Sequence, residues 1–518
     1  MNSIFNPQDD LSNLVTFKSG KYVPAFLFLI LSCFPLLVFG DDYAIQRIVD
    51  DAYYYIVIGE NLIDVGESSF LPGIPTNGYH PLWLILVTAV GGLFGFSLTS
   101  IKLLEVAVIF AGFVMFIRLF RIQTFLEASF YTFSLWYILY SFSLVAMETS
   151  LLFPALVFFF ATILSDEKFF SSRRSVTIIF SSCIVIGTRL DSAFFVIPIL
   201  FVAPVSSKEK LHIFLGIFTV AAVYAVLNHV IFGTALPVSG SVKSLGGLQL
   251  NDHYKRQVIR DLSLINILNI KAAGSPWVFA TLALISTRAR RQTNSNSLVS
   301  AVIVASIIGL ILFGAKLLFG SSWAIWNWYG YPAIIFSLPI IWMVSTRNNG
   351  RLLSIGMIFL TAFLFREFAE KTLVMYPSHG FAEINRQFID EFSGLLAGET
   401  VAMGDRSGSF AYFYDGGVYQ TEGLVNRKEY LTVLKNAGDL RAHLCREGVN
   451  IFVDYEPIQE NYISMDIEIL RSSSTSFAGP HIKVHQFEEI AQHNDPSIFG
   501  SPIGANWDDR IYAWRLEC

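Results

Sequence analysis

Long apolar segments recur through the first 369 residues and constrain the fold more than any other feature of the chain. The first of them, residues 22–39, has about the length that a helix needs to cross a bilayer. It is too long for a typical signal-peptide core and no small-x-small cleavage motif follows it, so we expect it to stay as a signal anchor. Further spans are predicted at 103–120, 128–146, 150–165, 175–188, 192–205, 211–231, 277–287, 298–319, 324–344 and 352–366.

Charge divides the chain into two parts near residue 370. Residues 1–369 hold 24 Lys and Arg and 19 Asp and Glu, whereas residues 370–518 hold 12 and 22. About 12% of the first part is charged, against about 23% of the second, which is close to soluble domains. We predict an α-helical polytopic membrane bundle of about 11 to 13 spans, followed by an acidic globular domain. With 53% hydrophobic residues and a net charge of −5, a soluble multidomain enzyme is nearly excluded and no nucleic-acid partner is expected.

Basic residues in short loops orient the bundle, because Lys and Arg are retained on the cytoplasmic side. Placing every basic loop inside requires eleven crossings, with the N-terminus in the cytoplasm and the C-terminal domain outside. The basic loops are Lys18/Lys21, Arg118/Arg121, Lys168 to Arg174, Lys208/Lys210, Arg288 to Arg291 and Arg347/Arg351. The external loops are then 41–80, 147–149, 189–191, 232–276 and 320–327.

One apolar segment, 81–97, conflicts with this orientation if it crosses fully. Segment 103–120 would then run in the opposite direction and place Arg118 and Arg121 outside. Backbone that stops partway through a membrane is tolerated where protein surrounds it. We therefore expect 81–97 to dip into the outer leaflet or to lie against the bundle as a re-entrant helix.

Residues 370–518 are predicted to form a small α/β domain. The expected strands are Thr400–Met403, Ala411–Tyr414, Val418–Gln420, Asn450–Val453, His481–Gln486 and Arg510–Leu516, with helices near 381–396 and 427–438. Cys33 and Cys183 lie inside apolar runs and are expected to be small core residues. A disulfide between Cys445 and Cys518 and a pair of free thiols both fit the sequence.

Two adjacent carboxylates stand among aromatic residues in the first external loop, in the run Asp50-Asp51-Ala52-Tyr53-Tyr54-Tyr55. The near-helical alternation predicts an amphipathic helix over residues 44–64 on the outer membrane face. Neighbouring side chains on a helix diverge by about 100°, so only one carboxylate is expected to point into any one site. A carboxylate at the lipid boundary can accept a proton from a sugar hydroxyl, and partial desolvation raises its pKa toward a useful value. The alternative is that both are solvated surface or capping residues.

The order of motifs resembles a known enzyme class. The run from Asp50 to Tyr55, followed by Thr76-Asn77-Gly78-Tyr79-His80-Pro81-Leu82-Trp83, is similar to the first external loop of bacterial GT-C class membrane glycosyltransferases, in particular the branch with the mycobacterial arabinofuranosyltransferases. The similarity continues in Ala146-Met147-Glu148-Thr149-Ser150-Leu151, Thr188-Arg189-Leu190-Asp191-Ser192, the stretch Phe232 to Ser244, Gly404-Asp405-Arg406-Ser407-Gly408 and Glu422-Gly423-Leu424-Val425-Asn426.

The resemblance implies a transferase in the bacterial cytoplasmic membrane. It would move a sugar from a polyprenyl-phosphate carrier to a glycan, lipid or protein acceptor outside the cytoplasm, usually with inversion. The position that matches the family's catalytic base is Asp50, with Asp51 as its neighbour or substitute. The family pattern often has Phe where this chain has Tyr53. That departure leaves the base intact and bears on sugar specificity.

Cations near the headgroup would stabilise the negative charge that builds on the leaving phosphate. Lys102, Arg189 and Lys243 are the candidates that the predicted orientation places outside. Each has a structural alternative: headgroup snorkelling for Lys102, an ion pair with Asp191 for Arg189, and a mobile loop charge for Lys243. His80 is the fourth candidate, since it either binds a phosphate oxygen or caps the helix that follows Pro81.

Other residues are candidates for substrate binding. Glu148 stands at the outer end of a span, where it would orient a sugar hydroxyl or pair with Arg189. The aromatic cluster from Trp323 to Tyr331 fits an ordinary membrane-boundary belt, or sugar stacking and a grip on the prenyl chain. For Asp405 and Arg406 a turn role and acceptor binding are both open. The set expected to bind substrate is Tyr53, Tyr54, Asn77, Glu148, Asp191, Trp326 and Tyr329.

No resident cofactor is expected. His253, His379, His443 and His481 lack metal-binding spacing, Cys445 has no CxxC partner, and Gly246-Gly247 lacks the rest of a nucleotide-binding pattern. A divalent ion at Asp50 and Asp51 is a disfavoured alternative. Two other functions compete with the transferase: a secondary transporter, whose ionisable residues should lie mid-span in repeated halves, and a non-catalytic receptor whose tail recognises a cell-wall polymer.

Overall fold

The structure is a computed structural model. It describes residues 20 to 518 with gaps at 120–121, 123, 143–144, 165–173, 246, 249, 252–253, 256–296, 322–328, 330–331, 334, 337–360, 363, 371, 374–379, 437–439, 456–462, 465–480, 483–486 and 495–509. Trp326, the predicted span 277–287 and most of the spans 324–344 and 352–366 lie outside these residues.

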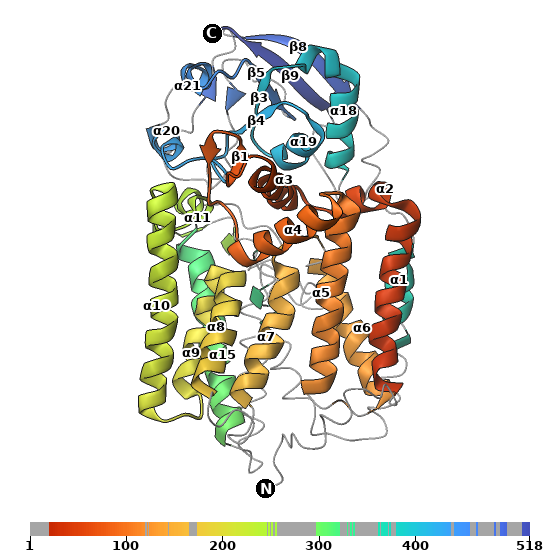
Figure 1. The fold of residues 1–518 in the computed structure, drawn as a ribbon, viewed down its shortest axis with the longest axis vertical. Helices are drawn as coiled ribbons and strands as arrows, with labels where there is room; N and C mark the ends of the chain where they lie inside the picture. The colour runs from red at the N-terminus through yellow and green to blue at the C-terminus, as the bar shows by residue number, and fades with distance from the viewer. Residues whose placement is uncertain are drawn as a thin grey trace.

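Apolar helices form a bundle on one side of the molecule (Figure 1). They are α1 (Val23–Phe39), α5 (Leu98–Leu119), α6 (Phe125–Phe142), α7 (Thr149–Leu164), α8 (Arg174–Thr188), α9 (Ala193–Val202), α10 (Ser207–Phe232) and α15 (Ser297–Phe319). Among the residues that the structure describes, four helical segments are long and apolar enough to cross a membrane: Gly20–Phe39, Leu98–Leu119, Ser207–Phe232 and Ala301–Phe319. The eleven-crossing orientation stays a prediction.

Local sequence sets the ends of these helices. α10 begins with a capping box, in which Ser206 Oγ accepts from the Glu209 backbone N–H and Glu209 accepts from the Ser206 N–H at 2.8 Å. It ends at Gly233, whose φ of 70° is the left-handed conformation that glycine adopts without steric cost. The direction in which the chain leaves α10 for the loop at 234–237 follows from this cap.

α4 (Pro81–Phe94) is the segment for which a partial insertion is expected. Its 14 residues extend for about 21 Å, which is shorter than a hydrocarbon core of about 30 Å. Figure 1 shows it running across the bundle beneath α3 (Asp50–Asp64), not parallel to α5 and α10. This geometry fits the expectation, and its depth in a membrane stays a prediction.

The helix predicted over residues 44–64 is wrong in two respects. The chain forms α2 (Asp41–Ala44) and a 3-10 turn, and it is extended at Ile48 and Val49 before α3 begins at Asp50. α3 is also not a surface helix, because Ala52 to Gly59 are buried between α4 and α19 (Ser407–Phe413). The alternating pattern therefore reflects packing on two sides. A short hairpin, β1 (Ser69–Leu71) and β2 (Ile74–Pro75), follows α3.

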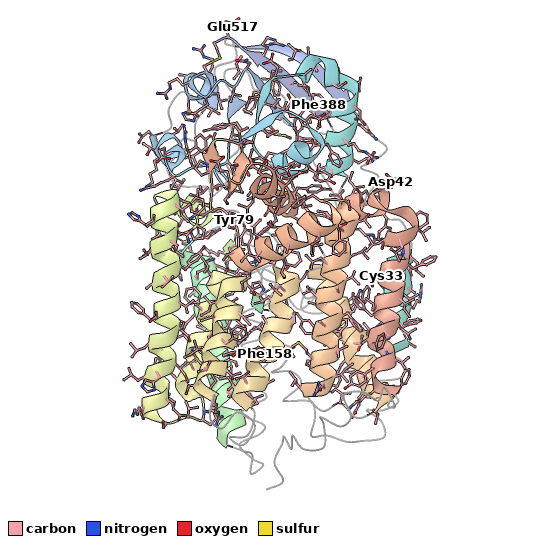
Figure 2. All side chains as sticks on the ribbon, viewed as in Figure 1. Cys33, Asp42, Tyr79, Phe158, Phe388 and Glu517 are labelled. Atoms are coloured by element: carbon pink, nitrogen blue, oxygen red, sulfur yellow. A yellow bond between two sulfur atoms is a disulfide. The ribbon has the colours of Figure 1, made fainter. Side chains whose placement is uncertain are left out.

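Residues from 380 onward, which we call the tail domain, form a five-stranded mixed sheet with helices beside it. The strand order is β4-β3-β5-β9-β8, with β3, β4 and β5 parallel and β9 antiparallel to both neighbours. The strands are β3 (Thr400–Met403), β4 (Gly417–Gln420), β5 (Ile451–Asp454), β8 (Phe487–Asn494) and β9 (Arg510–Leu516), and the helices are α18 (Phe381–Leu396), α19, α20 (Tyr430–Asn436) and α21 (Leu440–Arg446). Tyr79 lies at the level where the bundle meets this domain, in which Phe388 is buried (Figure 2).

The predicted strand Ala411–Tyr414 is wrong, because Ala411 to Phe413 belong to α19. A short apolar run does not distinguish a strand from a buried helix by periodicity. Of the predicted strand His481–Gln486 only β7 (His481–Ile482) is described, pairing with β6 (Ile463–Ser464), and β8 begins after it. α21 had no sequence prediction. The boundary near residue 370 stays a prediction.

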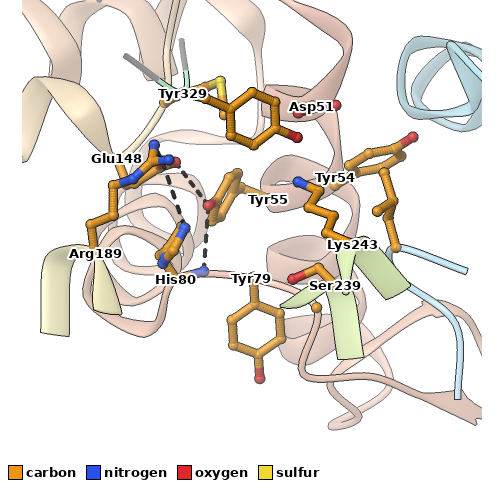
Figure 3. A pocket seen from close by; sticks show the side chains of 13 residues that line it. Asp51, Tyr54, Tyr55, Tyr79, His80, Glu148, Arg189, Ser239, Lys243 and Tyr329 are labelled. Atoms are coloured by element: carbon orange, nitrogen blue, oxygen red, sulfur yellow. Dashed lines mark hydrogen bonds and ion pairs between the residues drawn. The ribbon is translucent and has the colours of Figure 1, made fainter. Parts of the chain in front are cut away.

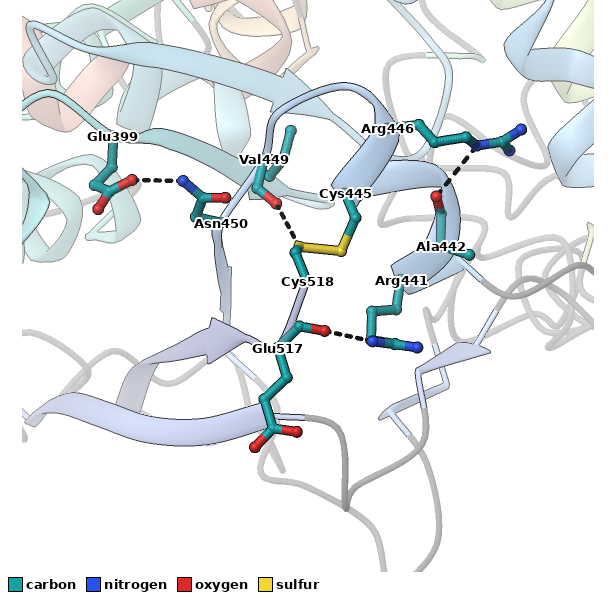
Figure 4. The surroundings of a disulfide bond; sticks show 9 residues. All are labelled: Glu399, Arg441, Ala442, Cys445, Arg446, Val449, Asn450, Glu517 and Cys518. Carbon is teal, nitrogen blue, oxygen red and sulfur yellow. Dashed lines mark hydrogen bonds between the residues drawn. A yellow bond between two sulfur atoms is a disulfide. The ribbon is translucent and has the colours of Figure 1, made fainter.

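The structure favours the disulfide over free thiols, since Cys445 and Cys518 are bonded with their Cα atoms 5.4 Å apart (Figure 4). The bond joins the end of α21 to the residues that follow β9. Beside it, Asn450 donates to Glu399 Oε2 at 2.9 Å and the Arg441 guanidinium donates to the Glu517 carbonyl. The last strand of the sheet is thus tied to a helix 73 residues earlier in the chain.

Candidate functional site

A cavity lies where α3, the loop before α4 and α11 (Val238–Lys243) meet beneath the tail domain (Figure 3). Its walls come from seven separate parts of the chain, six in the bundle region and one in the tail domain. The lining residues are Asp51, Tyr54, Tyr55, Gly78, Tyr79, His80, Met147, Glu148, Arg189, Ser239, Lys243, Tyr329 and Leu424. Candidates predicted from motifs far apart in sequence therefore line one space.

Asp51 is the carboxylate of the Asp50-Asp51 pair that lines this cavity. It stands in the first turn of α3, and the helix carries Tyr54 and Tyr55 into the same space three and four residues later. Burial raises the pKa of Asp51 to about 6, although nearby Lys243 opposes the shift. Asp51 is therefore ionised at neutral pH yet basic enough to accept a proton.

Arg189 links two carboxylates in a chain of buried ion pairs. Its Nη1 donates to Glu148 Oε1 at 2.9 Å and its Nε donates to Asp191 Oδ1 at 3.0 Å. Lys316 extends the chain, with Nζ 3.6 Å from Asp191 Oδ2. The two ion pairs predicted as alternatives are present, because Arg189 pairs with both Glu148 and Asp191. Arg189 and Glu148 also line the cavity, and their roles in binding substrate stay predictions.

Tyr55 and His80 also approach the Glu148 carboxylate. The Tyr55 hydroxyl donates to Glu148 Oε2 at 2.9 Å, and His80 Nε2 lies 3.7 Å from Glu148 Oε1. His80 is the residue before α4, but its side chain makes no capping hydrogen bond there. Burial lowers the pKa of His80, so the ring is neutral at pH 7. A neutral imidazole can donate one hydrogen bond to a ligand oxygen.

Lys243 enters the cavity from the last turn of α11. Its Nζ lies 4.8 Å from the ring centroid of Tyr329, which is buried and forms the opposite wall (Figure 3). The predicted aromatic cluster thus contributes Tyr329 to the cavity. Trp326 of the same cluster lies outside the described residues.

Asp50 does not line the cavity and instead contacts the tail domain. Its Oδ2 accepts from the Gly408 N–H at 2.9 Å, and its Oδ1 accepts from the Ser409 N–H at 2.7 Å and the Ser409 hydroxyl at 2.6 Å. Burial raises the pKa of Asp50 to about 7, against the lowering effect of these hydrogen bonds. Three donors from one segment occupy both carboxylate oxygens.

Tyr53 and Asn77 do not line the cavity and have structural roles instead. Tyr53 is buried against the rings of Tyr412 and Phe413. Asn77 donates to Asn228 Oδ1 at 2.8 Å and accepts from the Val238 N–H at 2.9 Å, which joins α10 to α11.

Lys102 is also placed elsewhere than the sequence suggested. It is neither at a headgroup nor in the cavity, because it is buried in α5 in an ion pair with Glu105 one turn later. This position does not support the expectation that Lys102 binds the donor phosphate directly. A counter-ion three residues away on the same helix face neutralises its charge.

The Lys102–Glu105 pair fixes the segment that presents Glu148. Glu105 Oε1 accepts from the Ala146 N–H and from Ser150 Oγ, each at 2.7 Å. Trp83 Nε1 donates to the Ala146 carbonyl at 3.0 Å. Ala146 has a φ of 63°, a left-handed conformation that is uncommon for a non-glycine residue. These contacts stabilise the strained turn immediately before Met147 and Glu148.

Several lining residues had no prediction from the sequence. Ser239 belongs to the same stretch as Lys243, and Leu424 belongs to a resembling tail motif, but neither is titratable. Lys316, which contacts Asp191 and does not itself line the cavity, also had no prediction. It interrupts an apolar span, and an ionisable residue in such a place is a functional signal by itself.

Arg406 and Asp405 do not line the cavity. Arg406 is buried, with a φ of 64° and its guanidinium stacked on Phe381 and Tyr455. This contact places it in the core of the tail domain, beneath the start of α18. Within the described ranges, no three His, Cys, Asp or Glu side chains are grouped so that they could hold a metal ion.

No protein-family model matches the chain, and no curated protein matches it. Among solved structures, the fold is similar to that of ArnT from Cupriavidus metallidurans in the apo state, with 11% sequence identity and a TM-score of 0.48 over 95% of this chain and 98% of that one.

Proposed function

We propose that this chain is a membrane glycosyltransferase of the GT-C type that moves a sugar from a polyprenyl-phosphate carrier to an extracytoplasmic acceptor. The observation that carries the proposal is a cavity in which Asp51, a desolvated carboxylate, faces the same space as Lys243 and Arg189. A base and cations in one site are what attack by a hydroxyl on a sugar phosphate requires.

The cations are matched to the charge that develops on the leaving group. Among the described lining residues, Arg189 and Lys243 balance Asp51 and Glu148, so a phosphodiester with one negative charge meets no net repulsion. As the bond between the anomeric carbon and the phosphate oxygen breaks, a second negative charge develops on the phosphate. Lys243 and Arg189 would stabilise that charge, and neutral His80 would donate one hydrogen bond to a phosphate oxygen.

Asp51 takes the base role in this proposal, instead of Asp50. The acceptor oxygen forms a bond to the anomeric carbon, and its proton passes to the Asp51 carboxylate. The electron pair of the broken bond stays on the phosphate oxygen, which leaves as polyprenyl phosphate. Attack from the face opposite the phosphate inverts the anomeric centre. Glu148 and Tyr55 both line the cavity, which supports a role for them in orienting sugar hydroxyls.

The disulfide supports an extracytoplasmic tail domain. Such bonds persist in oxidising compartments and are rare in the cytosol. The Cys445–Cys518 bond therefore agrees with the side that the Lys and Arg distribution predicts for residues 370–518. The cavity beneath this domain would open at the outer face of the membrane, where the acceptor is found.

The test uses purified protein in nanodiscs with a panel of short-chain prenyl-phosphate pentoses and hexoses. We expect the wild-type chain to transfer or release sugar from at least one member. Asp51→Asn should lower the rate by about 10²- to 10⁴-fold, the contribution of a general base. Asp64→Asn is the matched control, because Asp64 is an exposed carboxylate at the end of the same helix.

Full activity in Asp51→Asn would contradict the mechanism. Failure of the wild-type chain to process any panel member, with uptake of a labelled solute by the same protein in liposomes, would favour a transporter instead. Mass spectrometry of cell-envelope glycans from a deletion strain would then identify the acceptor and linkage of a confirmed transferase.

A further inference from the structure

The contact between Asp50 and the tail domain joins residues about 358 positions apart in the chain. Both oxygens of the Asp50 carboxylate are occupied, by the Gly408 N–H on one side and by the Ser409 N–H and hydroxyl on the other. Ser409 Oγ is itself held by Asn385 Nδ2 at 2.8 Å, from α18. Both carboxylate oxygens of Asp50 therefore accept hydrogen bonds from the tail domain.

The two backbones approach closely at this contact. A Cβ at Gly408 would lie 2.4 Å from the Asp50 carbonyl oxygen and 2.9 Å from Asp50 Oδ2. Only glycine permits this distance. One turn later on α3, the Tyr54 hydroxyl lies 3.2 Å from Ser407 Oγ. The segment Ser407-Gly408-Ser409 thus contacts α3 at two successive turns, and the cavity residues Asp51 and Tyr54 are part of those turns.

The direction of Asp51 depends on the conformation of this first turn. Residue 50 is the first of α3, preceded by Val49 in an extended conformation with no side-chain cap. First turns lack intrahelical acceptors for their N–H groups and fray unless other contacts hold them. The contacts that hold this turn come from a separate part of the molecule.

We propose that Asp50 is a positioning residue, which fastens the first turn of α3 to Ser409 and Gly408 of the tail domain so that Asp51 faces the cavity. The effect that we expect on catalysis rests on the proposed function. The orientation of Asp51 by this contact rests on the geometry alone. It makes the tail domain a component of the active site that sets the direction of the base. Asp50 itself touches neither the donor nor the acceptor.

The structural consequence can be measured without any substrate. Asp51→Cys and Met147→Cys, each in a Cys33→Ala, Cys183→Ala background, place single reactive thiols on two walls of the same cavity. A water-soluble methanethiosulfonate reagent then reports how far each position is open to the cavity. Asp50→Asn, or the milder Ser409→Ala, is added to each of the two reporters.

We expect the labelling rate at position 51, divided by the rate at position 147, to fall roughly fivefold in Ser409→Ala, which is the factor that one lost hydrogen bond gives. If the contact merely closes the tail over the cavity, both rates change together and the ratio stays constant. A constant ratio in Ser409→Ala and Asp50→Asn would overturn the proposal.

The catalytic consequence separates Asp50 from Asp51 by the pH profile. With the prenyl-phosphate sugar that the wild-type chain processes, Asp50→Asn should lower kcat by about 10- to 100-fold through misplacement of the base and leave the KM for the donor nearly unchanged. It should keep the fall in rate below about pH 6 that Asp51 causes. Combining Asp50→Asn with Ser409→Ala should lower kcat no further than Asp50→Asn alone, because both disrupt one contact.

If the rate of Asp50→Asn no longer falls at low pH, Asp50 is the base and the inference is overturned. If the wild-type chain processes no panel member, the proposed function fails, while the labelling ratio still decides whether Asp50 positions residue 51. The two failures are therefore distinguishable.

Discussion

The two walls of the cavity are held in place by different kinds of interaction. On one wall, Glu148 and Arg189 are part of a chain of ion pairs that ends at Asp191 and Lys316, all within the helical bundle. On the other wall, the first turn of α3 is held by hydrogen bonds from the uncharged groups of Ser409 and Gly408 in the tail domain. We call these the bundle wall and the α3 wall.

This difference indicates which wall can change its conformation. Removing one partner of a buried ion pair leaves an uncompensated charge and costs about 3–5 kcal/mol, so the bundle wall is rigid. A single hydrogen bond contributes only about 0.5–1.5 kcal/mol, or up to about 3 when one partner is charged. The α3 wall is therefore expected to respond to the tail domain, and with it the direction of Asp51.

The largest expected effect is on the bundle wall, in Glu105→Leu. This change removes the counter-ion of Lys102 and the acceptor of the Ala146 N–H and Ser150 Oγ. We expect a loss of about 3–5 kcal/mol in the free energy of unfolding, measured in detergent micelles. The double variant Lys102→Met, Glu105→Leu is the control, since it removes both charges and should recover most of the loss. Equal loss in both variants would show that the ion pair does not hold this wall.

The pH dependence of the reaction is expected to come from the α3 wall. Because burial raises the pKa of Asp51 to about 6, the base is ionised above that pH and protonated below it. kcat/KM should therefore fall as pH decreases through 6, tenfold per unit, to about one hundredth at pH 4. A rate independent of pH between 4 and 8 in the wild-type chain would remove Asp51 from the base role.

Sequence reasoning identified the bundle wall better than the α3 wall. The position of Glu148 at the outer end of a span pointed to this residue, and the predicted orientation pointed to Arg189 and Lys243 as external cations. Lys102 met the same criterion, but its counter-ion Glu105 is three residues along the same helix face and was visible in the sequence.

The choice between Asp50 and Asp51 was not accessible from the sequence. Adjacent side chains on a helix point in different directions, but only the contact between Asp50 and the tail domain shows that Asp51 is the one that faces the cavity. The segment that makes this contact includes α19, whose apolar run was assigned to a strand because a run this short fits either structure. Long apolar helices and strands such as Thr400–Met403 were predictable, since length and pattern determine them locally. Contacts between distant segments have no such local signal.

A smaller effect is expected from Gly408→Ala on the α3 wall. The added Cβ would lie 2.4 Å from the Asp50 carbonyl oxygen, so α19 and α3 must separate. Overpacking of this kind costs about 1–3 kcal/mol, and we expect a lower midpoint of thermal unfolding together with faster hydrogen exchange in residues 407–413. Gly394→Ala is the matched control, because its Cβ meets no atom within 4 Å in α18 and alanine favours a helix. Equal hydrogen-exchange rates in Gly408→Ala and Gly394→Ala would show that the contact between Gly408 and Asp50 does not hold residues 407–413 in place.

The smallest effect is expected from Ala146→Gly on the bundle wall. Glycine adopts the φ of 63° without the steric cost that alanine has there, but the buried methyl group is lost. Relief of about 1 kcal/mol and a methyl contribution of about 0.8 kcal/mol oppose each other, so the free energy of unfolding should change by less than about 1 kcal/mol. The hydrogen bonds of this turn involve only its backbone N–H and carbonyl, to Glu105 and Trp83, and they remain in the variant. Activity and the labelling rate at position 147 should therefore be unchanged, whereas a large loss of either would mean that the alanine side chain, and not the ion pair beneath it, holds Glu148 in the cavity.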